Sequence, residues 1–151
     1  MKLYAHNMST TSRPILMFCQ EQDVGIELMP IDLLSGEHKQ DSFKRINPNG
    51  MVPVLEDDGF VLTESSAILK YLAEKVGSPT YPKELTLRAR INEIMDWVNT
   101  QFYREIAFHV NYQKSSQTKH GLARKKIRAS LTGVSKGWFP SSKYLTVGGT
   151  C

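Results

Sequence analysis

The sequence contains little cysteine and no long apolar run. Cys19 and Cys151 are the only cysteines in 151 residues, and neither belongs to a CxxC pair or to a cluster with zinc-ligand spacing. The pattern predicts no dithiol redox centre and no metal site, and it is typical of a reducing compartment such as the cytoplasm. The first ten residues lack the apolar run of a signal peptide, and no segment is long enough to span a membrane. We therefore expect a cytoplasmic protein that does not contact membranes.

Acidic residues are missing from the last third of the chain. All fifteen Asp and Glu residues lie at or before Glu105, whereas residues 106–151 carry eight Lys or Arg residues and no acid. Such a sharp change in charge indicates two differently built segments. The basic run ARKKIR (residues 123–128) suggests nucleic-acid binding, but no aromatic side chains interleave with its charges as a stacking surface requires. We interpret it as a solvated face or loose tail and expect no nucleic-acid partner.

The first 77 residues have the pattern of a compact α/β unit with a mixed sheet. Apolar residues alternate with polar ones in the expected strands and recur every three or four residues in the expected helices. Asp57, Asp58 and Gly59 form a hairpin-turn signal between two strands. The predicted order is β-α-β-α-β-β-α, with strands at 2–5, 26–34, 52–56 and 60–62 and helices at 15–24, 41–46 and 66–76.

A helical segment follows the α/β unit. Residues 78–83 are polar and rich in proline, which is typical of a linker. Apolar residues from Leu87 to Ile106 then recur at helical spacing, which predicts one long helix over residues 84–110. Periodicity is poor from about residue 112, so we assign 84–151 to a partial all-α domain with a candidate disordered tail.

One apolar run, GMVPVL at residues 50–55, carries a proline where a core strand is expected. Proline has no N–H for a sheet ladder, so sheets admit it at edges, first residues or bulges. Pro53 could protect a sheet edge from pairing.

A second pattern, LTESSAI at residues 62–68, places Glu64 and Ser65 at a predicted helix start. Free N–H groups and the helix dipole favour an anion there, and Glu64 could accept a hydrogen bond from a ligand ammonium. Hydroxyl residues between Thr63 and Ser66 could instead serve as simple helix caps, and the two roles can coexist.

Four motifs occur in a recognisable order: MSTTSRP, DLLSGEHK, NPNGMVPVL and LTESSAI, followed by YPKELTLRARINEIMDW. Over residues 1–112 the chain resembles the cytosolic glutathione S-transferases, with most similarity to the serine-type theta-like and bacterial members. The resemblance implies a thioredoxin-like N-terminal domain, part of an all-α domain, and a homodimer that uses glutathione as co-substrate and no metal. It ends near Tyr112, which we interpret as a truncated or altered C-terminal half.

The resemblance also assigns glutathione-binding residues. Pro53 is implied to follow a cis peptide bond, so that the Val52 main chain meets the cysteinyl part of glutathione. The γ-glutamyl end would be held at the helix start, and the glycyl carboxylate in the GEHK loop. The family often has Lys or Arg where Met51 stands, so weaker binding is expected here. The implied binding residues are His38, Lys39, Val52, Pro53, Glu64 and Ser65.

Ser9 is the proposed catalytic residue because it is first in the SxxSR pattern of the theta-like group. A free thiol titrates near pH ~8.5, and a hydroxyl that donates to the sulfur beside a helix N-terminus stabilises the thiolate. Ser12, Thr10 and Thr11 are rivals, and one of them is expected to cap the first helix. Cys19 has helix-core spacing and is expected to be buried and inert.

Three functions remain open from the sequence. The first is a glutathione transferase that conjugates glutathione to a small electrophile, whose identity the sequence does not reveal. The second is a glutathione-dependent reductase of disulfides or peroxides on the same fold. The third is a non-catalytic interaction module, which the incomplete all-α domain favours.

Overall fold

The computed structural model describes residues 1–107. The chain divides into two compact units, Met1–Ala89 and Arg90–Cys151. The predicted end of the long helix at residue 110, the tail from about residue 112 and the basic run at 123–128 lie outside the described residues. The division at residue 89 leaves the boundary of 1–77 and the linker of 78–83 as predictions.

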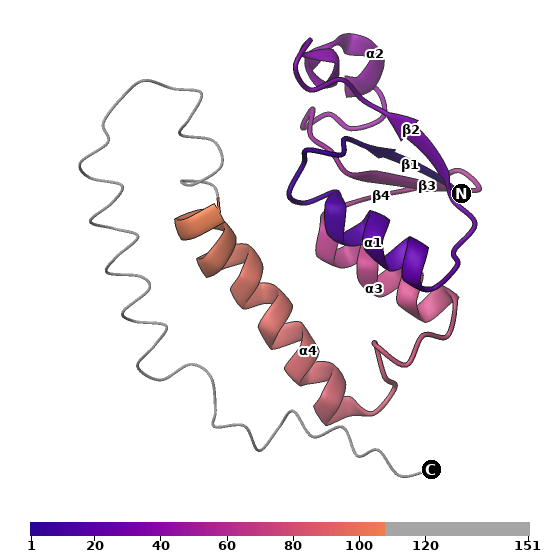
Figure 1. Ribbon diagram of the computed structural model, residues 1–151, viewed down its shortest axis with the longest axis vertical. Helices are drawn as coiled ribbons and strands as arrows, with labels where there is room; N and C mark the ends of the chain where they lie inside the picture. Colours follow the sequence, from indigo (N-terminus) through magenta and orange to yellow (C-terminus); the bar gives the residue numbers. More distant parts are fainter. Residues whose placement is uncertain (108–151) are drawn as a thin grey trace. The chain divides into compact units, whose positions relative to one another are not determined.

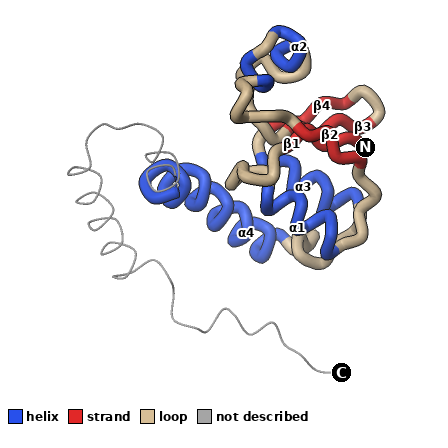
Figure 2. Tube along the Cα trace, turned by 45° about the horizontal axis from the view of Figure 1, so that its top comes forward, coloured by secondary structure: helices blue, strands red, loops and turns tan. Residues whose placement is uncertain are grey.

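A four-stranded mixed sheet forms the centre of the first unit, as predicted (Figure 1). The strand order is β2-β1-β3-β4; β2 is parallel to β1, and β3 is antiparallel to both β1 and β4. Helices α1 and α3 cover one face, and α2 lies beyond the other (Figure 2). The elements are β1 Lys2–Ala5, α1 Arg13–Glu21, β2 Glu27–Pro30, η1 Glu37–Lys39, α2 Asp41–Lys44, β3 Val54–Asp57, β4 Phe60–Thr63 and α3 Ser65–Lys75. This is the expected β-α-β-α-β-β-α order of a thioredoxin-like domain, with η1 as an added 3₁₀ turn.

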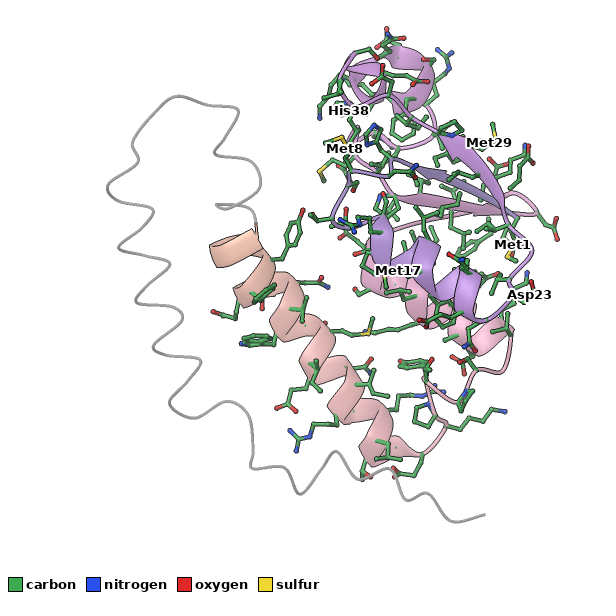
Figure 3. The ribbon with its side chains drawn as sticks, in the orientation of Figure 1. Met1, Met8, Met17, Asp23, Met29 and His38 are labelled. Carbon is green, nitrogen blue, oxygen red and sulfur yellow. The ribbon has the colours of Figure 1, made fainter. Side chains whose placement is uncertain are left out.

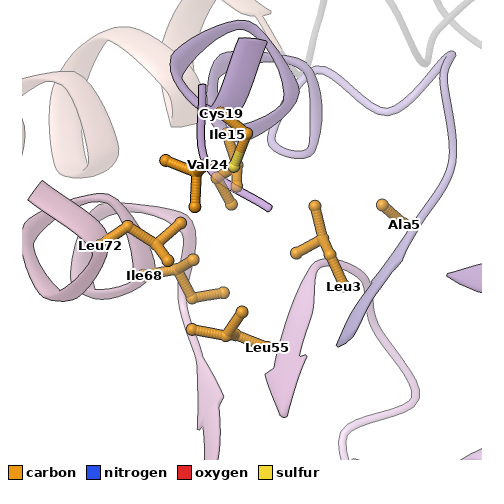
Figure 4. Close-up of a cluster of buried hydrophobic side chains, with 8 residues drawn as sticks. All are labelled: Leu3, Ala5, Ile15, Cys19, Val24, Leu55, Ile68 and Leu72. Atoms are coloured by element: carbon orange, nitrogen blue, oxygen red, sulfur yellow. The ribbon is translucent and has the colours of Figure 1, made fainter. Parts of the chain in front are cut away.

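The main core lies between the sheet and the helices α1 and α3. Side chains of a strand alternate between its two faces, so Leu3 and Leu55, which pair across β1 and β3, point to the same side. They pack with Ile15 and Cys19 of α1 and with Ile68 and Leu72 of α3 (Figure 4). Burial raises the pKa of the Cys19 thiol, which favours the uncharged form and agrees with its expected inert role.

A smaller core lies on the other face of the sheet. Phe43 of α2 is buried with Ile31 and Val54, and the Tyr4 ring meets the Phe43 ring edge to face at a centroid distance of 6.3 Å. These contacts hold α2 on the sheet. They thereby fix the start of the loop that runs from α2 to β3.

Several element bounds differ from the predicted ones. β2 ends at Pro30 rather than at residue 34, because β1 offers only four residues to pair with and Pro30 has no N–H to donate. The first helix begins earlier, at Arg13, and ends at Glu21. The turn η1 was not predicted, since its three residues carry no apolar periodicity.

The long helix predicted over residues 84–110 begins close to its expected start, but its geometry changes along its length. Helix α4 (Leu85–Trp97) crosses from the first unit into the second, and a π-helix, η2 (Val98–Ala107), continues it. At the start of α4, Arg88 donates to the Pro82 carbonyl over 2.8 Å and lies over the Tyr81 ring, which fixes the preceding segment. No helix within residues 1–107 is long and apolar enough to cross a membrane.

Candidate functional site

The candidate residues lie mainly in loops where β1 ends. Figure 3 shows Met8 and His38 at one edge of the first unit, whereas Met1 and Asp23 lie at the opposite edge. The loop after β1 holds Ser9, and η1 holds His38. The loop between α2 and β3 holds Val52, which lies within one side chain's reach of the β1 loop.

Ser9 is 3% exposed and is held firmly at the start of α1. Its N–H donates to the His6 carbonyl over 2.9 Å, and its carbonyl accepts from the N–H groups of Ser12 and Arg13. Its hydroxyl oxygen accepts from the Ser12 N–H over 3.2 Å and lies 3.0 Å from the Thr11 hydroxyl. The side chain of Ser9 therefore stabilises the turn that leads into α1, which begins at Arg13.

Ser12 occupies the N-cap position of α1, but its side chain makes no capping hydrogen bond. Its hydroxyl is fully buried and has no hydrogen-bond partner in the described part of the chain. The expectation of a hydroxyl cap from Ser12, Thr10 or Thr11 is therefore wrong for Ser12, because its side chain is fully buried and makes no capping hydrogen bond. Thr10 and Thr11 are half-buried, and the Thr11 hydroxyl donates to the Val52 carbonyl over 3.3 Å.

The peptide bond between Val52 and Pro53 is cis, as the resemblance implied. The pairing of β3 with β1 begins at Val54, opposite Tyr4. The predicted strand start at residue 52 is therefore wrong by two residues, because the chain enters the ladder only after Pro53. The main chain of Val52 lies outside the ladder, and Pro53 itself is buried.

The loop before Pro53 is fixed by two side chains. Buried Asn47 donates from Nδ2 to the Met51 carbonyl over 2.7 Å and accepts from the Asn49 N–H over 3.1 Å. The Lys39 ammonium donates to the Gly50 carbonyl over 3.0 Å. Sequence reasoning missed Asn47, although an Asn two residues before another polar turn residue is a known signal for a side-chain turn.

His38 lies in η1 with its Nδ1 atom buried and without a hydrogen-bond partner among the described residues. Burial lowers the pKa of His38 below its ordinary value, and the Lys39 ammonium lowers it further. The imidazole is therefore neutral at neutral pH and has an unused polar atom. Since Nδ1 has no access to solvent, a ligand would meet the ring at its other nitrogen, Nε2, whereas the Lys39 ammonium already holds the neighbouring loop.

Glu64 and Ser65 stand at the start of α3, as predicted. Glu64 is the N-cap residue with φ 66°, and its side chain makes no capping hydrogen bond. The predicted hydroxyl cap at 63–66 is therefore wrong, because a carboxylate residue in a left-handed conformation takes this position. The Glu64 carboxylate is exposed, and Ser65, beside it, is the first residue of α3, so both stand where a ligand could reach the helix start.

The structure thus brings some of the candidate residues together. Thr11 connects the Ser9 loop to Val52, and a Cβ atom built on Gly50 would lie 2.8 Å from the His38 carbonyl, so these loops are in direct contact. The side chains of Glu64 and Ser65 make no hydrogen bond to these loops in the part of the chain that is described.

Comparison with known proteins gives one family. Residues 1–74 match the glutathione S-transferase N-terminal domain. Human glutathione S-transferase theta-1 is 40% identical over 106 residues, which are 69% of this chain and 44% of that protein. The chain therefore spans less than half the length of this relative.

Two solved structures are also similar to this chain. Human glutathione transferase theta-2, in complex with glutathione and an unknown ligand, gives a TM-score of 0.81 at 30% identity, over 96% of this chain and 61% of that one. A diazinon-metabolizing glutathione S-transferase of the silkworm Bombyx mori gives 0.76 at 33% identity, over 87% and 64%. On its N-terminal domain, its theta-class relatives and its fold, the chain belongs to the glutathione S-transferase family.

Proposed function

We propose that this chain binds glutathione in its N-terminal domain and activates the thiol for attack on an electrophilic carbon. The observation that carries the proposal is the position of Thr11, 3.0 Å from the Ser9 hydroxyl and 3.3 Å from the Val52 carbonyl. The side chain of Thr11 therefore contacts both the Ser9 hydroxyl and the main chain of Val52, so these two groups lie about one side chain apart. The cysteinyl residue of glutathione needs such a spacing, because its main chain would pair with Val52 while its sulfur meets Ser9.

The main chain of Val52 would pair with the cysteinyl main chain of glutathione. An extended peptide can dock on free N–H and C=O groups at the end of a sheet, as an added strand does. The ladder begins at Val54, so these groups of Val52 are not used by β1. Pro53 separates Val52 from Val54, the first residue of the ladder.

The two ends of glutathione would meet different groups. Its γ-glutamyl carboxylate is suited to the N-terminus of α3 and the Ser65 hydroxyl, and its ammonium to the Glu64 carboxylate. Its glycyl carboxylate would accept a hydrogen bond from Nε2 of the neutral His38 ring, with the Lys39 charge nearby. Met51 is exposed and supplies no charge to that end.

Ser9 would activate the thiol. A donor hydrogen bond from its hydroxyl, together with the positive end of α1, stabilises the thiolate relative to the thiol. The thiolate then forms the carbon–sulfur bond while the leaving group of the electrophile takes the electron pair. Ser9 itself forms no covalent bond in this scheme.

Two experiments on the full chain test the proposal. Isothermal titration calorimetry with glutathione should show binding to a single site per chain, and an assay with a reactive alkyl or aryl halide should show conjugation. In Ser9→Ala we expect kcat/KM to fall roughly 10- to 100-fold, as for loss of a hydrogen bond to a charged group. Ser12→Ala is the matched control and should retain activity. No binding of glutathione, or activity lost in Ser12→Ala and kept in Ser9→Ala, would refute the proposal.

The other functions considered from the sequence have no observation in their favour. Parallel assays with an organic hydroperoxide and with a mixed disulfide separate a reductase from a conjugating enzyme. Binding of glutathione without any turnover would indicate the interaction module. A homodimer and a cytoplasmic location stay predictions.

A further inference from the structure

Three hydrogen bonds form a continuous chain from the start of α1 to the loop before Pro53. The Ser12 N–H donates to Ser9 Oγ over 3.2 Å, Ser9 Oγ lies 3.0 Å from Thr11 Oγ1, and Thr11 Oγ1 donates to the Val52 carbonyl over 3.3 Å. Ser9 is buried and Thr11 is half-buried, so bulk water has little access to the Ser9 hydroxyl.

The directions of these hydrogen bonds follow from counting protons. A carbonyl oxygen only accepts, so the single hydroxyl proton of Thr11 is used on Val52. The hydrogen bond between Ser9 and Thr11 must then be donated by Ser9. The Ser9 proton therefore points to Thr11, and in this arrangement Ser9 can offer a ligand only a lone pair.

The proposed function needs the opposite direction, because a thiolate requires a donor. The same proposed function places a ligand N–H on the Val52 carbonyl. A good N–H···O bond there weakens the carbonyl as an acceptor for a second donor. The Thr11 contact with Val52, at 3.3 Å, is already longer than its contact with Ser9, at 3.0 Å.

We propose that Thr11 is a positioning residue that reverses the proton order of this chain when a peptide-like ligand pairs with Val52. The Thr11 hydroxyl turns from Val52 to donate to Ser9 Oγ, and the Ser9 hydroxyl turns to donate to the ligand sulfur. The inference rests on the proposed function, and it adds that docking of the ligand main chain switches Ser9 from acceptor to donor.

The reversal needs no movement of the backbone. Two hydroxyl rotations are sufficient, and such rotations take picoseconds to nanoseconds. In the reversed state Ser9 Oγ accepts from both Ser12 and Thr11 and donates once, so its hydrogen-bonding capacity is filled. Acceptance from Thr11 polarises the Ser9 hydroxyl and makes it a better donor.

The test compares Thr11→Val, which removes the hydroxyl at nearly constant shape, with Thr11→Ser, which keeps it. The readout is the pKa of the thiol of bound glutathione, followed by the ultraviolet absorbance of the thiolate. We expect an upward shift of about 0.3 to 0.6 pH units in Thr11→Val and none in Thr11→Ser, as for loss of cooperative support to one charged hydrogen bond. Affinity for S-methylglutathione, which has no ionisable thiol, should be equal or higher in Thr11→Val because Thr11 no longer competes for Val52.

A double-mutant cycle with Ser9→Ala assigns the effect to Ser9. Thr11→Val should cause no further shift of the thiol pKa when Ser9 is already alanine. An unchanged pKa in Thr11→Val, or an equal shift with and without Ser9, would overturn the inference while binding of glutathione by the unmodified chain upholds the proposed function. If the unmodified chain binds neither glutathione nor S-methylglutathione, the proposed function fails and the inference fails with it.

Discussion

Ser9 and Ser12 are three positions apart and have opposite environments. The hydroxyl of Ser9 takes part in two hydrogen bonds, whereas that of Ser12 is fully buried with no partner among the described residues. A buried hydroxyl without a partner costs free energy, and its removal relieves that cost.

We predict that the two alanine variants differ in stability as well as in activity. Ser9→Ala should lower the free energy of unfolding by about 1 kcal/mol, as for loss of a buried hydrogen bond. Ser12→Ala should leave it unchanged or raise it slightly. Urea unfolding followed by circular dichroism measures both, and an equal loss in the two variants would contradict the hydrogen-bond assignment.

At position 51 the chain has an uncharged methionine. Met51 is exposed beside the loop that contacts His38, so Met51→Lys should add a charge near the ligand carboxylate. We predict up to about 5-fold tighter binding of glutathione, the range of an exposed ion pair. The gain should disappear at high salt. Met51→Gln is the uncharged control, and an equal gain there would show that charge is not the cause.

Residue roles were predictable where a motif carries them. The sequence patterns placed Glu64 and Ser65 at a helix start and left Val52 beside a proline that interrupts a strand. The role of Thr11 was not predictable, because it depends on a contact with a residue 41 positions away and on the direction of a proton. The role of Ser9 in the turn before α1 was missed because four adjacent hydroxyl residues have similar propensities at a helix start.

At the scale of elements, the loop between α2 and β3 is shaped by close packing against η1. Gly50 has φ 58°, and an added Cβ would lie 2.8 Å from the His38 carbonyl. Gly59 also has a positive φ, of 85°, but a Cβ there would meet no atom within 4 Å.

These two glycines give a matched pair of variants. Gly59→Ala should cost only the backbone preference, about 1 kcal/mol. Gly50→Ala adds a clash with main chain, so we expect a larger loss of about 2 to 4 kcal/mol. It should also displace His38 and weaken glutathione binding, which Gly59→Ala should not do. Thermal unfolding and calorimetry check both; equal effects would contradict the packing argument.

A charged cluster joins β3 to α3. Asp57 is buried, accepts from the Tyr71 hydroxyl over 2.6 Å and forms an ion pair with Lys75. The Lys75 ammonium and then the Tyr71 hydroxyl hold the pKa of Asp57 below its ordinary value. The stabilisation is therefore present above the unfolded pKa of about 3.9 and is lost as the pH falls through the lower folded value.

The cluster predicts an acid limit to stability. The free energy of unfolding should fall on acidification below about pH 4, and Asp57→Asn should flatten this dependence. Asp58→Asn, at the exposed neighbouring position, is the control and should keep it. Chemical unfolding between pH 3 and pH 7 measures the slopes. A slope unchanged in Asp57→Asn would show that other carboxyl groups cause the acid limit.

Most elements of the first unit could be predicted from periodicity, and their ends could not. β2 ends at Pro30, and β3 begins directly after Pro53. The last or first paired residue of each strand depends on which residues the neighbouring strand β1 supplies. The turn η1 and the π-helix that follows α4 lack a simple sequence signal. Their geometry depends on packing rather than on apolar spacing.

At the scale of the whole molecule, α4 and η2 expose large apolar side chains. Ile94, Val98 and Phe102 follow one another at intervals of four residues and are 55%, 37% and 40% exposed. Exposed apolar residues that form a row are typical of surfaces that associate.

We predict that the chain self-associates and that this row contributes to association. The double variant Ile94→Gln, Val98→Gln should shift the sedimentation coefficient toward that of the monomer at equal concentration. A double change of exposed polar residues on the same segment, Asp96→Asn with Gln101→Glu, should not. A monomer at all concentrations for the unmodified chain would contradict the prediction.

At Glu64, the residue that would give the most stable backbone differs from the residue that we assign to ligand binding. A glutamate at φ 66° bears a conformational cost of about 1 to 3 kcal/mol that glycine would avoid. A laboratory screen that rewards heat resistance alone would therefore favour replacement of Glu64, and with it the carboxylate that we assign to the ligand ammonium. A residue that lowers stability at a position where glycine would raise it is expected where selection acts on function and not on stability.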